Sequence, residues 1–196
     1  MIITPTLVIE LLEQVTKLHI PFMVGGSFPS SAWGQPRQTN DLDIALLMTA
    51  QDAARLHEVT RGSFMGSEAG MLEALESKEP FASFQLLHFE ETFKIDFFVL
   101  APDEYVVGAL ARARPYEIAP GKPFPFTSPE DIVLTKLRWF ELGNRISDKQ
   151  WNDIVQILEI QRGHLDYSYL DKWSQWFGVV DLLHDALSQV VIDSES

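Results

Sequence analysis

The stretch that decides the fold runs from Val24 to Leu47 and reads VGGSFPSSAWGQPRQTNDLDIALL. It opens with two glycines and a serine, and it closes with Asp41-Leu42-Asp43 at the start of an apolar run. Residues i and i+2 of a strand point to the same face. If residues 41–47 form a strand, the two aspartates therefore project together, about 6–7 Å apart along the backbone.

Two carboxylates held this close repel each other unless a cation lies between them. Mg²⁺ suits such hard oxygen ligands, because it takes one or two protein carboxylates and fills its other positions with water and phosphate oxygens. The upstream glycines allow the backbone to approach a ligand closely, and a helix beginning after them directs free N–H groups at an anion. The stretch therefore predicts a metal–triphosphate site.

Composition indicates a globular protein with a core of its own. The chain has 196 residues, 46 % of them hydrophobic, and no cysteine, which excludes disulfides, thiolate metal sites and a cysteine nucleophile. Residues 1–5 lack a basic segment followed by a long apolar one, and no apolar run approaches the length of about 20 residues needed to span a bilayer. We expect a soluble, cytoplasmic protein that does not bind membranes.

The charge balance is strongly acidic. Fifteen Lys and Arg against 28 Asp and Glu give a net charge of −13, which repels a nucleic-acid backbone. The densest basic cluster before the C-terminal helices, Arg112, Arg114 and Lys122, is weak. We expect no generic nucleic-acid binding, while a single docked RNA substrate stays open.

Apolar periodicity and capping residues divide the chain into alternating elements and then into helices alone. Helices are predicted over residues 5–18 (started by Thr4-Pro5), 27–33, 50–60, 68–76 and 103–113, and strands over 21–24 and 41–47. The four prolines of residues 114–127 predict an extended connection. Helices then follow over 129–142, from 147, 167–177 and 179–191.

Residues 81–100 predict an antiparallel hairpin, because two apolar runs flank a short polar turn. Asp96 lies inside the second arm, between Ile95 and Phe97. An unpaired buried carboxylate is costly, so Asp96 needs a partner. Lys94 shares its face by the period of two, and a simple exposed strand face therefore stays open as the alternative.

Three features now stand together: Gly25-Gly26-Ser27, the run Arg37-x-Thr39-x-Asp41-x-Asp43, and Asp96 in KIDFF. This combination resembles the nucleotidyltransferase superfamily related to DNA polymerase β. Downstream, SPEDIVLTKL (128–137) and SDKQWNDI (147–154) resemble a bacterial branch that includes minimal nucleotidyltransferases and abortive-infection toxins. The resemblance covers roughly residues 22–160.

The resemblance implies an α/β (α+β) fold: a mixed-sheet nucleotidyltransferase core with flanking helices over 1–127, and a helical C-terminal subdomain over 128–196. It implies an enzyme that moves a nucleoside monophosphate from a nucleoside triphosphate such as ATP to an acceptor hydroxyl, with two Mg²⁺ ions. Asp41, Asp43 and Asp96 would be the catalytic and metal-binding residues, with Asp96 also taking the acceptor's proton. The implied nucleotide-binding residues are Gly25, Gly26, Ser27, Arg37 and Lys136.

Plain structural interpretations stand beside these roles. The Asp41–Asp43 pair is also typical of a solvated strand end, and Gly25-Gly26 of a turn. Lys136 is equally consistent with a solvated helix lysine, and Arg37 with a residue that pins its loop to a carboxylate.

Other polar residues are expected to be structural. Asp153 is interpreted as the partner of Arg138 or Arg145 in an ion pair. The five histidines show no spacing typical of metal ligands, and the C-terminal tryptophans fit a helical core.

The acceptor is not identified by any residue. A small molecule, a protein or a tRNA all stay open, as does a toxin–antitoxin component with an antitoxin protein as its partner. The alternative function is a catalytically inactive nucleotide-binding or partner-binding module on the same fold, which the acidic surface also suits.

Overall fold

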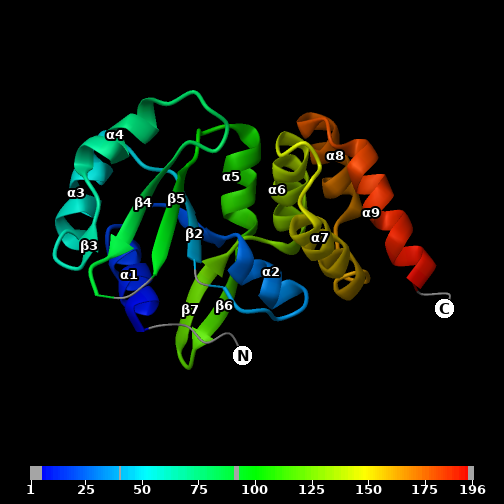
Figure 1. Ribbon diagram of the computed structural model, residues 1–196, viewed down its shortest axis with the longest axis horizontal. Helices are drawn as coiled ribbons and strands as arrows, with labels where there is room; N and C mark the ends of the chain where they lie inside the picture. Colours follow the sequence, from blue (N-terminus) through cyan, green and yellow to red (C-terminus); the bar gives the residue numbers. More distant parts are fainter. Residues whose placement is uncertain (1–5, 40, 91–92, 194–196) are drawn as a thin grey trace. The chain divides into compact units, whose positions relative to one another are not determined.

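The computed structural model describes residues 6–39, 41–90 and 93–193 of the chain. By its internal contacts the chain forms two compact units (Figure 1). The sheet unit comprises Met1–Phe28 and Gln38–Thr127, and the helical unit comprises Pro29–Arg37 and Ser128–Ser196. The helical unit therefore includes a short segment, Pro29–Arg37, that lies in the sequence between the two segments of the sheet unit.

The sheet unit is built on a mixed sheet that has seven strands among the described residues, in the order β3-β4-β5-β2-β1-β7-β6. Strands β2 and β5 are parallel, as are β1 and β7, whereas the other neighbouring pairs are antiparallel. The strands are β1 (Phe22–Gly25), β2 (Asp41–Leu46), β3 (Phe64–Met65), β4 (Ser83–His88), β5 (Lys94–Val99), β6 (Arg114–Ala119) and β7 (Lys122–Phe126).

Alternation along β2 determines which face carries polar groups. Leu42, Ile44 and Leu46 are fully buried, whereas Asp41 and Asp43 alternate with them on the more accessible face. Because the period of a strand is two, burying the leucine–isoleucine set forces both aspartates to the same side. The burial of the apolar side chains of β2 therefore determines the face on which both aspartates lie.

The sheet unit contains the helices α1 (Thr6–Lys17), α3 (Ala50–Thr60), α4 (Glu68–Glu76) and α5 (Glu104–Arg112). Helix α2 (Ser27–Trp33) begins in this unit and continues into the helical unit from Pro29. Helix α1 buries Val8, Leu11, Leu12 and Val15 at helical spacing. Helix α3 begins with a capping box, in which Thr49 and Asp52 each satisfy a backbone N–H of the other.

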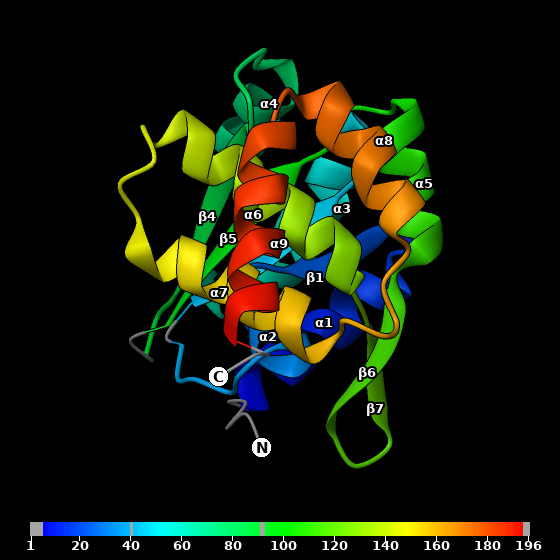
Figure 2. The same cartoon turned by 90° about the vertical axis from the view of Figure 1, so that its right-hand side faces the viewer.

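The helical unit contains α6 (Pro129–Leu142), α7 (Asp148–Ile160), α8 (Tyr167–Phe177) and α9 (Val180–Asp193). Helix α6 contacts α7 and α8, and α9 contacts α7 and α8, so the four helices pack side by side (Figure 2). Ser128 caps α6, with Pro129 at the first helical position. Buried Asp131 accepts hydrogen bonds from the hydroxyl groups of Ser128 and Tyr169, at 2.6 and 2.7 Å.

The predicted mixed α/β fold is confirmed, as are the hairpin of residues 81–100 and the helices from residues 27, 50, 68, 129 and 147. The predicted helix start at Thr4-Pro5 lies outside the described residues. Residues 114–127 are extended, as predicted, but they are more than a connection, because β6 and β7 form an antiparallel hairpin in which Pro115 lies opposite Pro125. Extended segments and edge strands tolerate proline, so the prolines excluded a helix but not this pairing.

No described helix combines the length and the apolar character that crossing a bilayer requires.

Candidate active site

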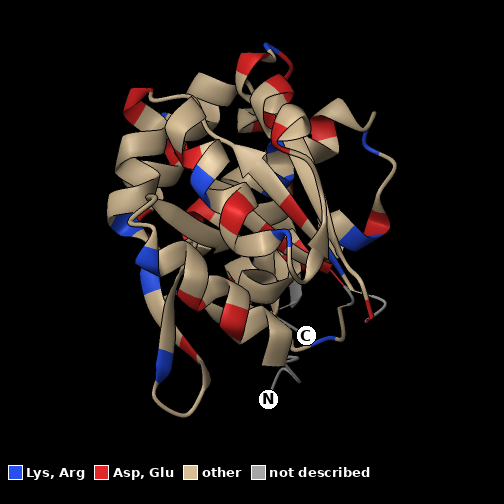
Figure 3. Cartoon of the chain, turned by 90° about the vertical axis from the view of Figure 1, so that its left-hand side faces the viewer, with Lys and Arg blue, Asp and Glu red and all other residues tan. Residues whose placement is uncertain are grey.

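The candidate site lies where β1, β2 and β5 run side by side in the sheet. Strands β2 and β5 are parallel and in a register that places Asp43 opposite Asp96 and Asp41 opposite Lys94. Neighbouring strands lie about 4.8 Å apart, and partners in register share a face. Asp41, Asp43 and Asp96, here called the acid cluster, therefore project from one face of the sheet; Figure 3 shows the acidic residues in red.

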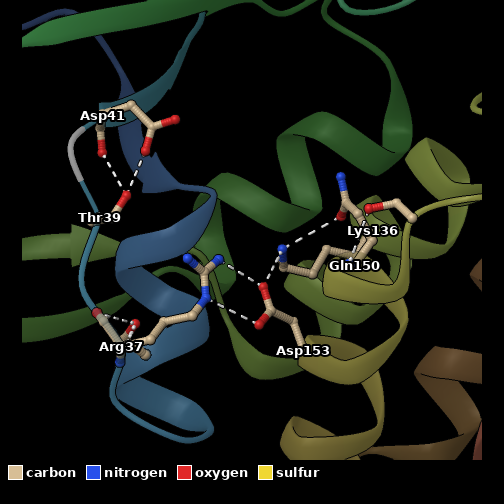
Figure 4. A network of polar contacts seen from close by, with 8 residues as sticks. Arg37, Thr39, Asp41, Lys136, Gln150 and Asp153 are labelled. Atoms are coloured by element: carbon tan, nitrogen blue, oxygen red, sulfur yellow. Dashed lines mark hydrogen bonds and ion pairs between the residues drawn. The ribbon is translucent and has the colours of Figure 1, made fainter.

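Two neighbouring side chains already bond to the acid cluster. The Thr39 hydroxyl donates a hydrogen bond to the carboxylate of Asp41 (Figure 4). The Nζ atom of Lys94 lies 2.6 Å from Oδ2 of Asp96, which is only 8 % exposed. The buried carboxylate therefore has the charged partner that its position in an apolar strand requires.

All three carboxylates of the acid cluster affect the pKa of Lys94. Its pKa is raised above the ordinary lysine value, chiefly by the hydrogen bond to Asp96. Partial burial opposes this increase, while the negative charges of Asp96, Asp41 and Asp43 add to it. The face thus carries a negative potential that all three acids create.

Gly26 forms the wall of the site next to Asp43. Strand β1 pairs antiparallel with β2, so that Gly25 lies opposite Asp43, and the following Gly26 has a φ of +62°. A Cβ atom built on Gly26 would lie 1.6 Å from Oδ2 of Asp43. Only a glycine allows the backbone to turn this close to that carboxylate. Ser27, the first residue of α2, is buried directly after this turn.

The donor set of the acid cluster fits a divalent cation of the Mg²⁺ type. It consists of hard carboxylate oxygens on two adjacent strands, and the bonded Lys94 ammonium shows that the face accommodates positive charge. Within the described residues, no group of three acidic or histidine side chains already stands at metal-binding spacing. A divalent ion bound by Asp96 would take the place that Lys94 has at that carboxylate.

Arg37 and Lys136 belong to the helical unit, where both bond to Asp153 (Figure 4). The Nε and Nη2 atoms of Arg37 lie 3.2 and 2.9 Å from the two carboxylate oxygens, and Nζ of Lys136 lies 2.9 Å from Oδ2. Lys136 also lies 3.5 Å from the amide oxygen of Gln150. These four residues are called the Asp153 network.

Arg37 and Lys136 stabilise the ionised form of the Asp153 carboxylate. Burial alone would raise its pKa, but the hydrogen bonds and positive charges of Arg37 and Lys136 outweigh burial and lower it. The predicted partners Arg138 and Arg145 are wrong: Arg145 bonds to Glu141, and Arg138 stacks over the ring of Phe177. Arg37 reaches Asp153 because residues 29–37 belong to the helical unit, which sequence spacing does not reveal.

The predicted site residues thus fall into two groups. The structure brings Gly25, Gly26, Ser27 and the acid cluster together in the sheet unit, whereas Arg37 and Lys136 converge on Asp153 in the helical unit. Sequence reasoning assigned no role at the site to Lys94 or Thr39. The i,i+2 spacing of Lys94 and Asp96 was the available signal, but it was equally typical of an exposed strand face.

The fold is nucleotidyltransferase-like, as its similarity to solved structures shows. The antibiotic-resistance factor ANT(2″)-Ia is similar with a TM-score of 0.54 and 14 % identity, over 95 % of this chain and 97 % of its own. A structure of that protein holds adenylyl-2″-tobramycin.

Two further structures share this fold. One is an antigenic nucleotidyltransferase-like protein from Paracoccidioides brasiliensis, with a TM-score of 0.53 and 16 % identity over 93 % of this chain and 91 % of its own. The other is the lincosamide antibiotic adenylyltransferase LnuA bound to lincomycin, with a TM-score of 0.51 and 15 % identity over 82 % of this chain and 99 % of its own. No family model and no curated protein matches the sequence.

Proposed function

We propose that the chain is a Mg²⁺-dependent nucleotidyltransferase that moves a nucleoside monophosphate from a nucleoside triphosphate to an acceptor hydroxyl. The observation that carries the proposal is the parallel register of β2 and β5, which sets Asp96 opposite Asp43 on the face that also holds Asp41. Three carboxylates on two rigid strands suit a pair of divalent ions about 3.5–4 Å apart. The fold shared with the adenylyltransferase LnuA, and with ANT(2″)-Ia in its complex with adenylyl-2″-tobramycin, supports the same chemistry.

In the proposed reaction, the acceptor oxygen forms a bond to the α-phosphorus while the bond from that phosphorus to the leaving oxygen breaks. Pyrophosphate leaves, and the proton of the acceptor hydroxyl passes to the carboxylate of Asp96. Asp41 and Asp43 would hold the ions, and bound Mg²⁺ neutralises charge on the phosphate oxygens. The turn at Gly26 lets the backbone approach the triphosphate, and Ser27 offers a hydroxyl group.

The roles of Arg37 and Lys136 depend on Asp153. Both cations are bonded to its carboxylate, so neither is proposed as a first contact of the nucleotide in this arrangement. A triphosphate that recruited either cation would have to compete with Asp153. Phosphate binding by Arg37 and Lys136 therefore stays a prediction, tested by nucleotide affinity in Arg37→Met and Lys136→Met.

The acceptor class that we propose to test first is a small hydroxylated molecule. The ANT(2″)-Ia complex holds an adenylylated antibiotic, and LnuA holds lincomycin. The net charge of −13 disfavours a large RNA surface, although a docked tRNA or a protein acceptor remains to be tested. A toxin role, with an antitoxin partner, predicts growth arrest on overexpression that Asp96→Asn abolishes.

The test supplies each α-labelled nucleoside triphosphate with Mg²⁺ to purified protein, together with a cell extract, an aminoglycoside or a lincosamide. We expect label transfer in the parent protein and a loss of about 10²–10⁴-fold in Asp43→Asn and Asp96→Asn. Asp185→Asn is the matched control, since it removes the same charge from an exposed position of α9. Calorimetry with a non-hydrolysable triphosphate checks binding separately.

The absence of both label transfer and Mg²⁺-dependent nucleotide binding in the parent protein would refute the enzyme proposal. Equal transfer by the parent and Asp96→Asn would refute the assignment of the catalytic carboxylate while leaving the activity intact.

A second candidate function, a non-catalytic nucleotide- or partner-binding module, has one observation in its favour. The Lys94 ammonium already provides a positive charge beside Asp96, as a metal ion would. A module of this kind would bind no divalent cation, and an Asp41→Ala/Asp43→Ala double variant would keep every cellular effect of the parent. Loss of those effects in the double variant, with folding intact, would exclude it.

A further inference from the structure

Lys94 occupies the face of the sheet that carries the acid cluster. Its ammonium nitrogen lies 2.6 Å from Oδ2 of Asp96, and its register partner across the strand pair is Asp41. Asp96 is buried to 8 % exposure, at which a carboxylate requires a partner of opposite charge or several hydrogen bonds. In the structure, Lys94 is such a partner.

The charges on this face leave room for a stronger cation. The three carboxylates of the acid cluster and the Lys94 ammonium have formal charges that sum to −2, so Lys94 compensates only part of the negative charge of the cluster. The Lys94 side chain is 40 % exposed, on a flexible four-carbon stem, whereas the Asp96 side chain is 11 % exposed on a central strand. The lysine can therefore withdraw into solvent without moving β5, while the carboxylate stays in place.

We propose that Lys94 is the internal counter-cation of the acid cluster, which pairs with Asp96 in the metal-free protein and competes with the divalent cation for that carboxylate. Lys94 thereby lowers the metal affinity of the site and stabilises the cluster when no metal is bound. The inference rests on the proposed function for the identity of the competing ion.

Two opposite effects follow from removing this charge. Lys94→Met leaves three mutually repelling carboxylates without their internal cation, so the metal-free protein loses thermal stability. The same variant removes repulsion between the ammonium and an incoming divalent ion, so metal binding tightens by about tenfold, a value that allows for solvent screening. Lys94→Arg keeps the positive charge and is expected to resemble the parent in both respects.

The experiment measures Mn²⁺ binding by electron paramagnetic resonance and the Tm in EDTA and in Mg²⁺, for the full chain. The variants are Lys94→Met, Lys94→Arg and, as a matched control, Lys122→Met, which removes an exposed lysine that pairs with Glu13. We expect Lys94→Met alone to bind Mn²⁺ more tightly, to have a lower Tm in EDTA and to gain more Tm from Mg²⁺ than the parent. Neither readout requires an active enzyme or a known acceptor.

The possible failures are distinguishable. Equal Mn²⁺ affinity in the parent and Lys94→Met would overturn the role of Lys94 and leave the proposed function standing. Binding by Lys94→Met but not by the parent would support the role of Lys94 and favour the non-catalytic module. Binding by neither protein would overturn both the inference and the proposed function.

Discussion

Gly26→Ala tests whether close approach of the backbone to Asp43 builds the site. The φ of +62° at Gly26 is costly for any residue with a Cβ, by about 1–2 kcal/mol. The new Cβ would also lie 1.6 Å from Oδ2, 2.6 Å from Cγ and 2.9 Å from Cβ of Asp43. Rotation of the carboxylate relieves the first two contacts but not the third, because the Asp43 Cβ is fixed to β2.

The expected destabilisation combines two terms. The backbone conformation costs about 1–2 kcal/mol, and overpacking against a strand typically adds about 1–3 kcal/mol. We therefore expect Gly26→Ala to lower the free energy of unfolding by about 2–5 kcal/mol, measured by urea denaturation followed by circular dichroism. Displacement of the Asp43 carboxylate should also abolish Mg²⁺-dependent nucleotide binding, measured by calorimetry.

Two other glycines provide matched controls. Gly121 has a similar φ of +71°, but its added Cβ would meet no atom within 4 Å, so Gly121→Ala should show only the backbone cost and keep nucleotide binding. Gly25→Ala places a Cβ at ordinary contact distance, 3.8 Å from the Asp43 backbone oxygen, and should leave the free energy of unfolding nearly unchanged. Equal destabilisation in Gly26→Ala and Gly121→Ala, with nucleotide binding unchanged in both, would refute the close-approach argument.

Three further predictions concern the helical unit. Asp153→Asn removes the charge that binds both cations of the Asp153 network and should lower the free energy of unfolding by about 2 kcal/mol in urea denaturation; an unchanged midpoint would contradict this. The pKa of Asp153 is lowered in the folded protein, so its ion pairs contribute their full stabilisation above the unfolded pKa of about 3.9. This stabilisation is lost as pH falls through the folded pKa. The difference in the free energy of unfolding between the parent and Asp153→Asn should therefore decrease progressively as pH falls below about 4. Tyr169→Phe removes a hydrogen bond to buried Asp131 and should lower the free energy of unfolding by about 1.5–3 kcal/mol. In the control Tyr167→Phe, the lost hydrogen bond lies at an exposed position, and the free energy of unfolding should fall by about 0.5–1 kcal/mol. Similar losses in the two variants would contradict the argument from burial.

Much of the secondary structure could be predicted from the sequence because its signals act over a few residues. Ser128 and Pro129 mark the start of α6, and Thr49 with Asp52 marks the start of α3, through hydrogen bonds within one helical turn. The alternation of buried and accessible residues in β2 is equally local. For the same reason, the sequence could place Asp41 and Asp43 on one face without any knowledge of neighbouring strands.

Contacts between distant segments were harder to predict. The pairing of β6 with β7 depends on a partner strand and on the tolerance of edge strands for proline, neither of which a proline count reveals. Asp153 bonds to Arg37, a residue 116 positions away, instead of to an arginine nearby in the chain. The short strand β3 is defined by its pairing with β4, since two residues carry no periodicity.

The sequence by itself determined the composition of the candidate site: a glycine turn, two aspartates that share a strand face, and a third acid with a lysine two positions before it. Only the tertiary structure decided that β5 lies parallel to β2 in the register that sets Asp96 opposite Asp43. It also decided that the backbone of Gly26 lies close to the carboxylate of Asp43. Strand order and register depend on which apolar faces pack together across the whole sheet, and no short-range pattern encodes that choice.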